Sequence, residues 1–407
     1  MLAIEELSRA LRQDDRLTFE RLELLPPKGL AHDHVRLTGS GLLLRIPKQS
    51  QRGYQPHDNL IYQAACFDRV QRSGYGPGLA LVLPPSAALP LGALLVEEIF
   101  GRPLALAQDL PLLADSLAAI HRQDLPPPTD RPPLEDHHDP VRGLYQEIKQ
   151  QAAALPEAGL HPSSLDLLRE ELVWAQDFQR ACQHGPARQP QRLVLTDTHP
   201  GNFLVAGPPS AADRPAVQSS APASIHASVQ PGGGAGGGPG GEPGGDPSGG
   251  ISHRDDRPAH AVIVDLEKAL YGSPAIDLAH ATIYSSTTWD LETQAVLSPA
   301  QVGAFYRHYL TLLPDALRRD LRPWLLPLRR LLWLRAMTWC AFWQVQHQKA
   351  AKTPDARARS ARDWSAEKTS PRLIAHVAER VSHYLAPDTL GRMQQDWKGP
   401  DNLEGYL

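Results

Sequence analysis

The sequence predicts an α+β fold of two lobes, a small antiparallel-sheet lobe followed by a larger, mainly helical one. In the first hundred residues, short apolar runs of β type surround one segment with helical spacing. After Gly101, apolar residues recur mostly at helical intervals. Two further apolar runs, 202–206 and 260–265, have the composition of paired strands. We therefore expect an N-terminal lobe over 1–100 and a C-terminal lobe over 101–407.

In the first lobe, a glycine-containing turn at 38–41 predicts a hairpin over 35–47. Leu60, Ala64, Phe67 and Val70 share one face of a helix that ends before Gly74. The remaining predicted elements are strands at 79–83 and 92–98 and helical or mixed segments at 2–13 and 15–24.

The second lobe is expected to be mainly helical. A break is expected at Pro323 or Pro327, because proline removes a helical hydrogen bond and clashes with the preceding turn. The predicted helices span about 109–123, 141–154, 163–183, 276–284, 299–312, 315–349 and 370–385.

Composition excludes several classes of protein. The formal net charge is −4, which favours neither a nucleic-acid nor an anionic membrane partner. Cys66, Cys182 and Cys340 have no metal or redox spacing and are expected to be reduced thiols of a cytoplasmic protein. The N-terminus lacks the pattern of a signal peptide. Three arginines between Trp324 and Trp343 argue against a membrane span in the most apolar helix. The oligomeric state stays open.

One segment has too few apolar residues to fold. Residues 231–250 contain twelve glycines, and almost no large apolar residue occurs over about 207–258. Burial there could not offset chain entropy, so a disordered Gly/Pro/Ser-rich insertion is expected. An interdomain linker is the alternative. The flanking runs favour an insertion at a hairpin tip, because closure cost grows only logarithmically with loop length.

The residues around the insertion carry the chemical signal. Asp197 lies five residues before Asn202, between two apolar runs, and Asp265 ends the run that follows the insertion. In kinases such an aspartate orients and deprotonates the acceptor hydroxyl, while an asparagine and a second aspartate bind magnesium against ATP. Simpler interpretations are a turn aspartate at 197 and a strand-end cap at 265.

Five ordered motifs together resemble the aminoglycoside phosphotransferase and choline kinase-like family. They are Leu42–Pro47, Val96–Leu104, Leu117–His121, Asp197–Asn202 and Val264–Ala279. The resemblance implies a protein-kinase-like fold with an N-terminal nucleotide-binding lobe and a C-terminal catalytic and acceptor-binding lobe. It also implies an ATP- and Mg²⁺-dependent phosphotransferase acting on a hydroxyl of an unidentified small molecule.

The resemblance assigns expected roles to individual residues. Asp197 would be the catalytic residue, and Asn202 and Asp265 the magnesium ligands. The expected nucleotide-binding residues are Arg45, Lys48 and, at the hinge, Glu97 and Glu98. Candidate phosphate loops are the stretch from Gly29 to His34 and the turn from Gly39 to Gly41, the latter being equally a plain hairpin turn.

Three positions depart from the family pattern. Arg45 stands in place of a lysine, with Lys48 as a second candidate for the phosphates. Gln63 stands where a glutamate would pair with that cation, so Arg45 is expected to be held less firmly. Leu195 replaces a histidine. These departures leave open the alternative that the chain is a catalytically weak nucleotide-binding pseudokinase that acts as a regulatory or scaffold protein.

Two further acids have open roles. The resemblance implies that Asp277 steadies the catalytic loop without binding metal, and helix capping is the alternative. Glu267 would either add an outer-shell oxygen to the metal site or be solvated.

The charge of the helical lobe bears on the acceptor. From His280 to Val381 there are fifteen Lys and Arg against eight Asp and Glu. This excess opposes a polycationic acceptor and permits a neutral or anionic one. Trp339 and Trp343 share a helix face, and a core role is the simplest interpretation of such a stripe.

Overall fold

The computed structural model describes residues 4–26, 31–48, 50, 52–184, 189–207, 258–290, 293–352, 371–399 and 402–407. The predicted insertion falls almost entirely outside these residues, as do the first two residues of the stretch from Gly29 to His34.

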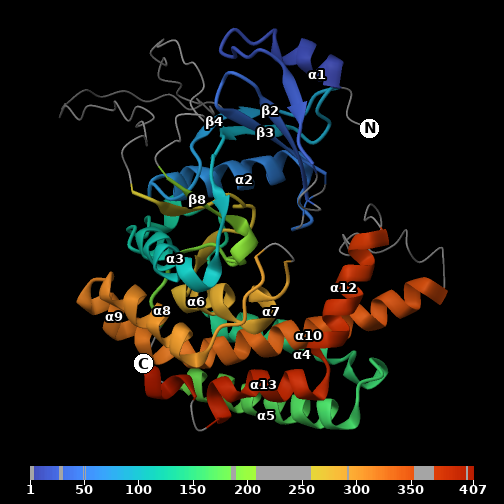
Figure 1. Ribbon diagram of the computed structural model, residues 1–407, viewed down its shortest axis with the longest axis vertical. Coiled ribbons are helices and arrows are strands. Elements are labelled where there is room, and N and C mark those ends of the chain that lie inside the picture. Colours follow the sequence, from blue (N-terminus) through green and yellow to red (C-terminus); the bar gives the residue numbers. More distant parts are fainter. Residues whose placement is uncertain are drawn as a thin grey trace, which may run out of the picture.

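The N-terminal lobe is a five-stranded antiparallel sheet with one helix on each face. Its strand order is β1-β2-β3-β5-β4. The strands are β1 (Leu22–Leu24), β2 (His32–Leu37), β3 (Leu42–Pro47), β4 (Leu79–Leu83) and β5 (Ala93–Glu97). The helices are α1 (Ile4–Leu11) and α2 (Pro56–Gln71). In Figure 1, α2 lies between this sheet and the helical lobe.

Alternation along β3 separates the two faces of the sheet. Leu44 and Ile46 are buried in a core cluster with Leu7 and Leu11 of α1. Arg45 points to the other face, where its guanidinium lies 5.3 Å from the centre of the Phe67 ring of α2. The predicted hairpin is therefore confirmed, and its alternation aims Arg45 at the interface between the lobes.

The C-terminal lobe is mainly helical and has two small sheets at its top. Strand order is β6-β8-β9 in one sheet and β10-β7 in the other. These strands are β6 (Arg102–Pro103), β7 (Arg192–Val194), β8 (Phe203–Ala206), β9 (His260–Ile263) and β10 (Leu270–Gly272). The helices are α3 (Leu106–His121), α4 (Pro140–Ala152), α5 (Pro162–His184), α6 (Pro274–Thr282), α7 (Tyr284–Thr287), α8 (Pro299–Thr311), α9 (Asp315–Leu321), α10 (Leu325–Lys352), α12 (Pro371–Tyr384) and α13 (Pro387–Lys398).

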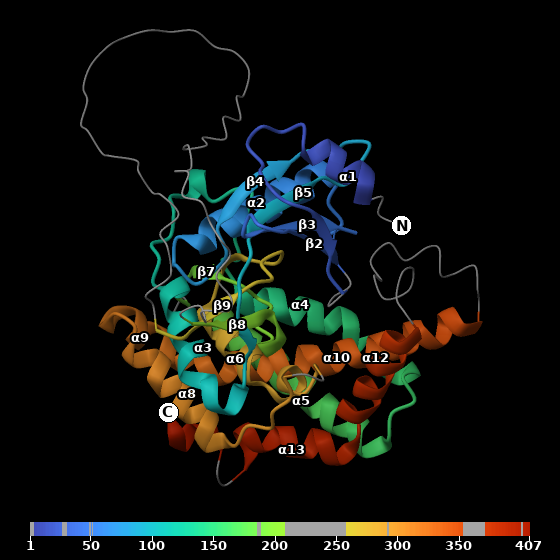
Figure 2. The same ribbon diagram turned by 45° about the horizontal axis from the view of Figure 1, so that its top comes forward.

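The two lobes are stacked, with the small sheets between them (Figures 1 and 2). Helix α10 runs through the centre of the larger lobe, and Leu328, Leu331 and Trp333 on it are fully buried. None of the helices in the described residues could cross a membrane.

Most predicted elements are confirmed, and the differences have local causes. Residues 22–24 are not helical but pair as β1 along Val35–Leu37, an edge that propensity alone does not reveal. The 315–349 segment breaks at Pro323 into α9, a 3₁₀ turn and α10, whereas Pro327 lies in the first turn of α10, where proline is tolerated. The short strands β6 and β10 and helix α13 had not been predicted.

Candidate active site

The loop that carries Asp197 and Asn202 runs from the end of β7 to the start of β8. A 3₁₀ turn, Pro200–Asn202, closes it, and the His199 side chain accepts a hydrogen bond from Gly201 N. Thr196, just before Asp197, has a φ of 60°. This left-handed conformation is rare for a β-branched residue, so surrounding contacts must hold it.

Asp277 supplies those contacts from α6. Its carboxylate is fully buried and accepts hydrogen bonds from Leu195 N at 2.7 Å and Thr196 N at 2.8 Å. His121 of α3 donates to the same carboxylate at 3.0 Å. Asp277 therefore steadies the loop and does more than cap a helix. Its contact with position 195 uses the backbone, so the leucine side chain does not disturb it.

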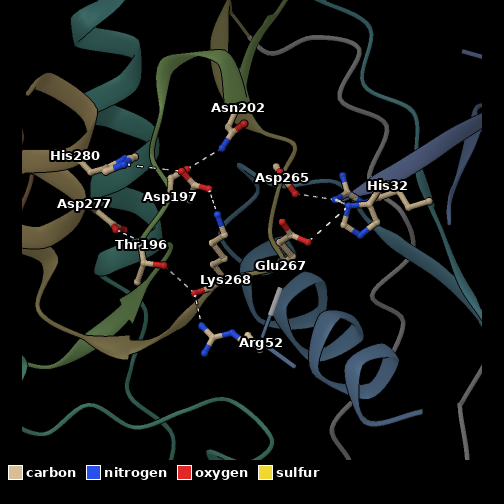
Figure 3. Close-up of polar contacts among 11 residues, drawn as sticks. His32, Arg52, Thr196, Asp197, Asn202, Asp265, Glu267, Lys268, Asp277 and His280 are labelled. Carbon is tan, nitrogen blue, oxygen red and sulfur yellow. Dashed lines mark hydrogen bonds and ion pairs between the residues drawn. The ribbon is translucent and has the colours of Figure 1, made fainter. Parts of the chain in front are cut away.

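Asp197 lies between basic side chains (Figure 3). Lys268 Nζ donates to its Oδ2 at 2.6 Å, and His280 Nε2 lies 4.0 Å from its Oδ1. Asn202 Nδ2 donates to the Asp197 carbonyl at 2.9 Å, which fixes the amide beside the aspartate. Burial opposes ionisation of Asp197, but Lys268 and the neighbouring His280 and His199 together outweigh it and hold the pKa well below its usual range.

Strand pairing brings Asp265 to this loop. Phe203 pairs with Ile263, and Val264 N donates to Asn202 O at 2.9 Å. Because β8 and β9 are antiparallel, the residues before β8 and those after β9 meet at one end. The hairpin predicted across the insertion is therefore confirmed, and Asp265 lies beside Asn202.

Arg45 is the partner of Asp265. Its Nη2 donates to Asp265 Oδ1 at 2.8 Å, and its Nη1 donates to Val264 O at 2.8 Å. Only 4% of Arg45 is exposed. The expectation that Arg45 is held loosely for want of a glutamate at 63 is wrong, because the partner comes from the other lobe. Burial opposes ionisation of Asp265, but Arg45, His32 and Lys268 together outweigh it and lower the pKa of that carboxyl.

A second buried group adjoins this pair. Gln63 accepts a hydrogen bond from His32 Nε2 at 3.1 Å, and His32 Nδ1 lies 3.7 Å from Glu267 Oε2. Glu267 is 6% exposed, so the solvated alternative is wrong. Its burial, with Asp265 nearby, raises the pKa of Glu267 to about 8. Burial and the Arg45 charge lower the pKa of His32 to about 3.

The oxygen donors fit a magnesium ion in chemistry and proximity. Asp265 and Asn202 supply carboxylate and amide oxygens, the hard ligands that Mg²⁺ prefers. One ligand atom each from His32, Asp265 and Glu267 lie within 4.8 Å of one another. Glu267 Oε2 is buried without a hydrogen-bond partner. Buried polar atoms are rarely left unpaired, and a bound cation would satisfy this oxygen.

The expected nucleotide-binding residues do not all converge. Lys48 lies 3.3 Å from Asp33 at the end of the β2–β3 hairpin. The Glu97 carboxylate accepts a hydrogen bond from Gly78 N, and Glu98 binds Arg36 at 2.6 Å. Both glutamates lie where the chain leaves β5 for the second lobe. Their side chains bind residues of the N-terminal lobe and so stabilise the connection between the lobes.

In the part of the chain that the structure describes, the arginines of α10 are held in ion pairs. Among the described residues, Arg329 pairs with Asp396 and Arg330 with Glu171, inside the lobe. Arg335, which pairs with Glu147, has a charge that interacts with Asp197. The overall count therefore does not describe the acceptor side. The tryptophans of α10 are core residues, with Trp333 fully buried and Trp343 6% exposed.

Sequence reasoning missed Lys268, His280, His32 and Arg52. Lys268 and His280 each follow a recognised acid by three residues, and this spacing was the available signal. His32 lies in a stretch predicted only as a phosphate loop, and Arg52 lies in a stretch without a motif, so only the folded chain reveals their position.

No protein-family model and no curated protein matches this chain. Solved structures resemble it along most of its length. A choline/ethanolamine kinase family protein from Mesorhizobium loti is 15% identical, with 99% of each chain covered and a TM-score of 0.49. A Plasmodium vivax ethanolamine kinase is 12% identical, covering 91% of this chain and 83% of its own, with a TM-score of 0.48. A spectinomycin phosphotransferase bound to ADP and spectinomycin is 12% identical, covering 99% and 96%, with a TM-score of 0.47.

These similar structures are kinases and phosphotransferases of the kind that the sequence motifs resemble. Identities of 12–15% and TM-scores below 0.5 do not establish what this chain binds. Its chemistry depends on the geometry of its own residues.

Proposed function

We propose that this chain is an ATP- and Mg²⁺-dependent phosphotransferase that transfers a phosphoryl group to a hydroxyl of a small molecule. The observation that carries the proposal is the meeting of Asp197, Asn202 and Asp265 at one end of the β8–β9 pair, facing Arg45 from the other lobe. An acid, an amide and a second acid beside a fixed cation are the parts that phosphoryl transfer needs.

Asp197 would act as the catalytic residue. The Lys268 ion pair keeps it ionised, so it can accept the proton of an acceptor hydroxyl at neutral pH. His280 lies by Oδ1, the oxygen that Lys268 leaves unused, so the hydroxyl would approach Asp197 there. The acceptor oxygen would then bond to the terminal phosphorus of ATP as ADP leaves.

Asp265 and Asn202 would hold magnesium, with Glu267 close enough to contribute. When bound, the metal neutralises charge on the phosphate oxygens. Arg45 holds Asp265 at 2.8 Å from across the lobe boundary. Its guanidinium can bind phosphate oxygens in pairs, so nucleotide binding would redistribute Arg45 between Asp265 and the phosphates.

The acceptor would be neutral or anionic rather than polycationic. The side chains whose charges interact with Asp197 include Lys268, His280, His199 and Arg335, all of basic type, and the acids Asp265 and Glu267, which belong to the proposed metal site. Glu147, an acid near this side, is already paired with Arg335. A polycation would find few free acids for binding, because recognition of such a ligand needs acidic walls.

A pseudokinase is the alternative that one observation favours. Arg45 binds one carboxylate oxygen of Asp265. A metal ion that uses this oxygen must displace Arg45, and the free energy of that displacement weakens metal binding. The two functions differ in turnover, which is therefore the quantity to measure.

The test is ADP release from Mg-ATP with separate pools of sugars, phosphorylated alcohols, amino alcohols and aminoglycosides, for the wild type and Asp197→Asn. We expect release with a neutral or anionic pool and a loss of about 10²-fold or more in the variant. Release with aminoglycosides alone would contradict the acceptor class. Nucleotide binding without release from any pool would favour the pseudokinase.

A further inference from the structure

Lys268 is fixed at both of its ends. Its side chain donates to Asp197 Oδ2 at 2.6 Å. Its carbonyl accepts one hydrogen bond from Arg52 Nη2 at 3.1 Å and another from Thr196 Oγ1 at 3.0 Å. Figure 3 shows Arg52 and Thr196 meeting at that carbonyl while the amine reaches Asp197. The orientation of Asp197 therefore depends on how firmly the Lys268 backbone is held.

Arg52 reaches this carbonyl from the other lobe. It lies between β3 and α2, and its guanidinium lies 4.6 Å from the centre of the Tyr62 ring. The same guanidinium forms an ion pair with Glu135, and the Tyr54 hydroxyl donates to Glu135 at 2.9 Å. The Arg52 side chain is only 18% exposed. A planar guanidinium held on its face and at its edge has little freedom, which makes it a firm anchor.

The second anchor is a strained residue. Thr196 needs its left-handed backbone to bring Oγ1 to the Lys268 carbonyl while its N–H binds Asp277. Strain of this kind persists where neighbouring contacts over-determine the conformation, and it often accompanies a functional site. Here the strained residue directly precedes Asp197, so the loop and Lys268 fix each other.

We propose that Arg52 is a positioning residue that acts through Lys268. Arg52 of the N-terminal lobe holds the Lys268 carbonyl, and Lys268 holds Asp197 in the orientation needed to meet the acceptor hydroxyl. The relay Arg52–Lys268–Asp197 links the closeness of the two lobes to the geometry of the catalytic aspartate. The inference rests on the proposed function for the role of Asp197.

The first test is a double-mutant cycle on ADP release from Mg-ATP, with water as the acceptor. A misplacement of about 1 Å can cost about 10²-fold in rate. Because Thr196 still holds the carbonyl, Arg52→Met should lower kcat about tenfold and leave the KM for ATP unchanged within about twofold. In a Lys268→Met background the same change should alter kcat by less than about twofold, since the relay is already broken.

Arg69→Met is the matched control. Arg69 also crosses between the lobes, where its Nη2 donates to Asp130 O at 2.6 Å, but it does not reach Lys268. Its kcat should stay at the wild-type value, and Arg52→Lys should recover part of the loss. Equal losses from Arg52→Met in both backgrounds, or no loss in either, would overturn the proposal.

A second readout does not need turnover. Acetic anhydride labelling followed by mass spectrometry gives the acetylation rate of Lys268 in each folded variant. Arg52→Met should raise this rate about threefold or more, because a released backbone opens locally, and Arg69→Met should not. An unchanged Lys268 rate in Arg52→Met would refute the relay. Absence of ADP release in the wild type with water and with every acceptor pool would instead refute the proposed function, and the labelling alone would then decide whether Arg52 holds Lys268.

Discussion

Asp277 offers the sharpest test of how the active-site loop is held. Its fully buried carboxylate accepts three hydrogen bonds, from Leu195 N, Thr196 N and the His121 ring. Asp277→Ala would remove all three acceptor contacts and leave the donors buried. Asp277→Asn would keep one oxygen and turn an amide donor toward the others.

The expected loss follows from these contacts. A buried donor left without a partner costs about 1–3 kcal/mol. Because the donors share one carboxylate and the loop can relax, we expect Asp277→Ala to lower the free energy of unfolding by about 4 kcal/mol. Asp277→Asn should cost about 2–3 kcal/mol, since half of the acceptor capacity remains.

Urea unfolding followed by circular dichroism measures both values. Asp388→Asn is the matched control, because Asp388 also lies in the first turn of a helix that begins with proline, yet it is exposed. Its removal should cost less than about 1 kcal/mol. A loss below about 1 kcal/mol for Asp277→Ala would refute the view that this carboxylate holds the strained loop.

Three further predictions concern the rest of the chain. Burial raises the pKa of the Cys66 and Cys340 thiols to about 12. A thiol reagent at about pH 8 should therefore label neither cysteine in the folded protein and both in denaturant. Rapid labelling of either cysteine in the native state would contradict this prediction. Burial lowers the pKa of His280 to about 4, below its unfolded value of about 6.5, so the unfolded state binds more protons across that window and stability falls as pH drops. His280→Gln should therefore lose less stability than the wild type between pH 7 and 5, as judged by urea midpoints, and an equal or larger loss would count against this. A Cβ at Gly92 would lie 2.7 Å from the Leu83 carbonyl oxygen, whereas one at Gly41, also at positive φ, meets nothing within 4 Å. Gly92→Ala should therefore lower the free energy of unfolding by about 1 kcal/mol more than Gly41→Ala, as measured by thermal unfolding. Equal losses for the two variants would contradict the clash.

Local sequence signals predicted the parts of the site that follow from the alternation and pairing of strands. The apolar runs on either side of the insertion predicted the β8–β9 pair, and this pairing brings Asp265 to Asn202. Alternation along β3 predicted the face of Arg45. Both are consequences of strand geometry, which depends on neighbouring residues alone.

Contacts between the lobes could not be predicted in the same way. Gln63 suggested a loosely held Arg45, but Arg45 binds Asp265, 220 residues away in the sequence. The pairing of Lys268 with Asp197 and the reach of Arg52 to Lys268 likewise depend on how two lobes stack. Burial also excludes the solvated alternative for Glu267, whose raised pKa comes mainly from desolvation that no spacing pattern encodes.

The most direct test of the proposed function is the magnesium dependence of ATP binding, measured by calorimetry on the wild type and Asp265→Asn. The proposal predicts binding that requires Mg²⁺ in the wild type and an affinity at least about tenfold weaker in the variant, because a carboxylate ligand has become an amide. Equal affinity for the two proteins, or wild-type binding that ignores Mg²⁺, would contradict Asp265 as a magnesium ligand and with it the proposed phosphotransfer site.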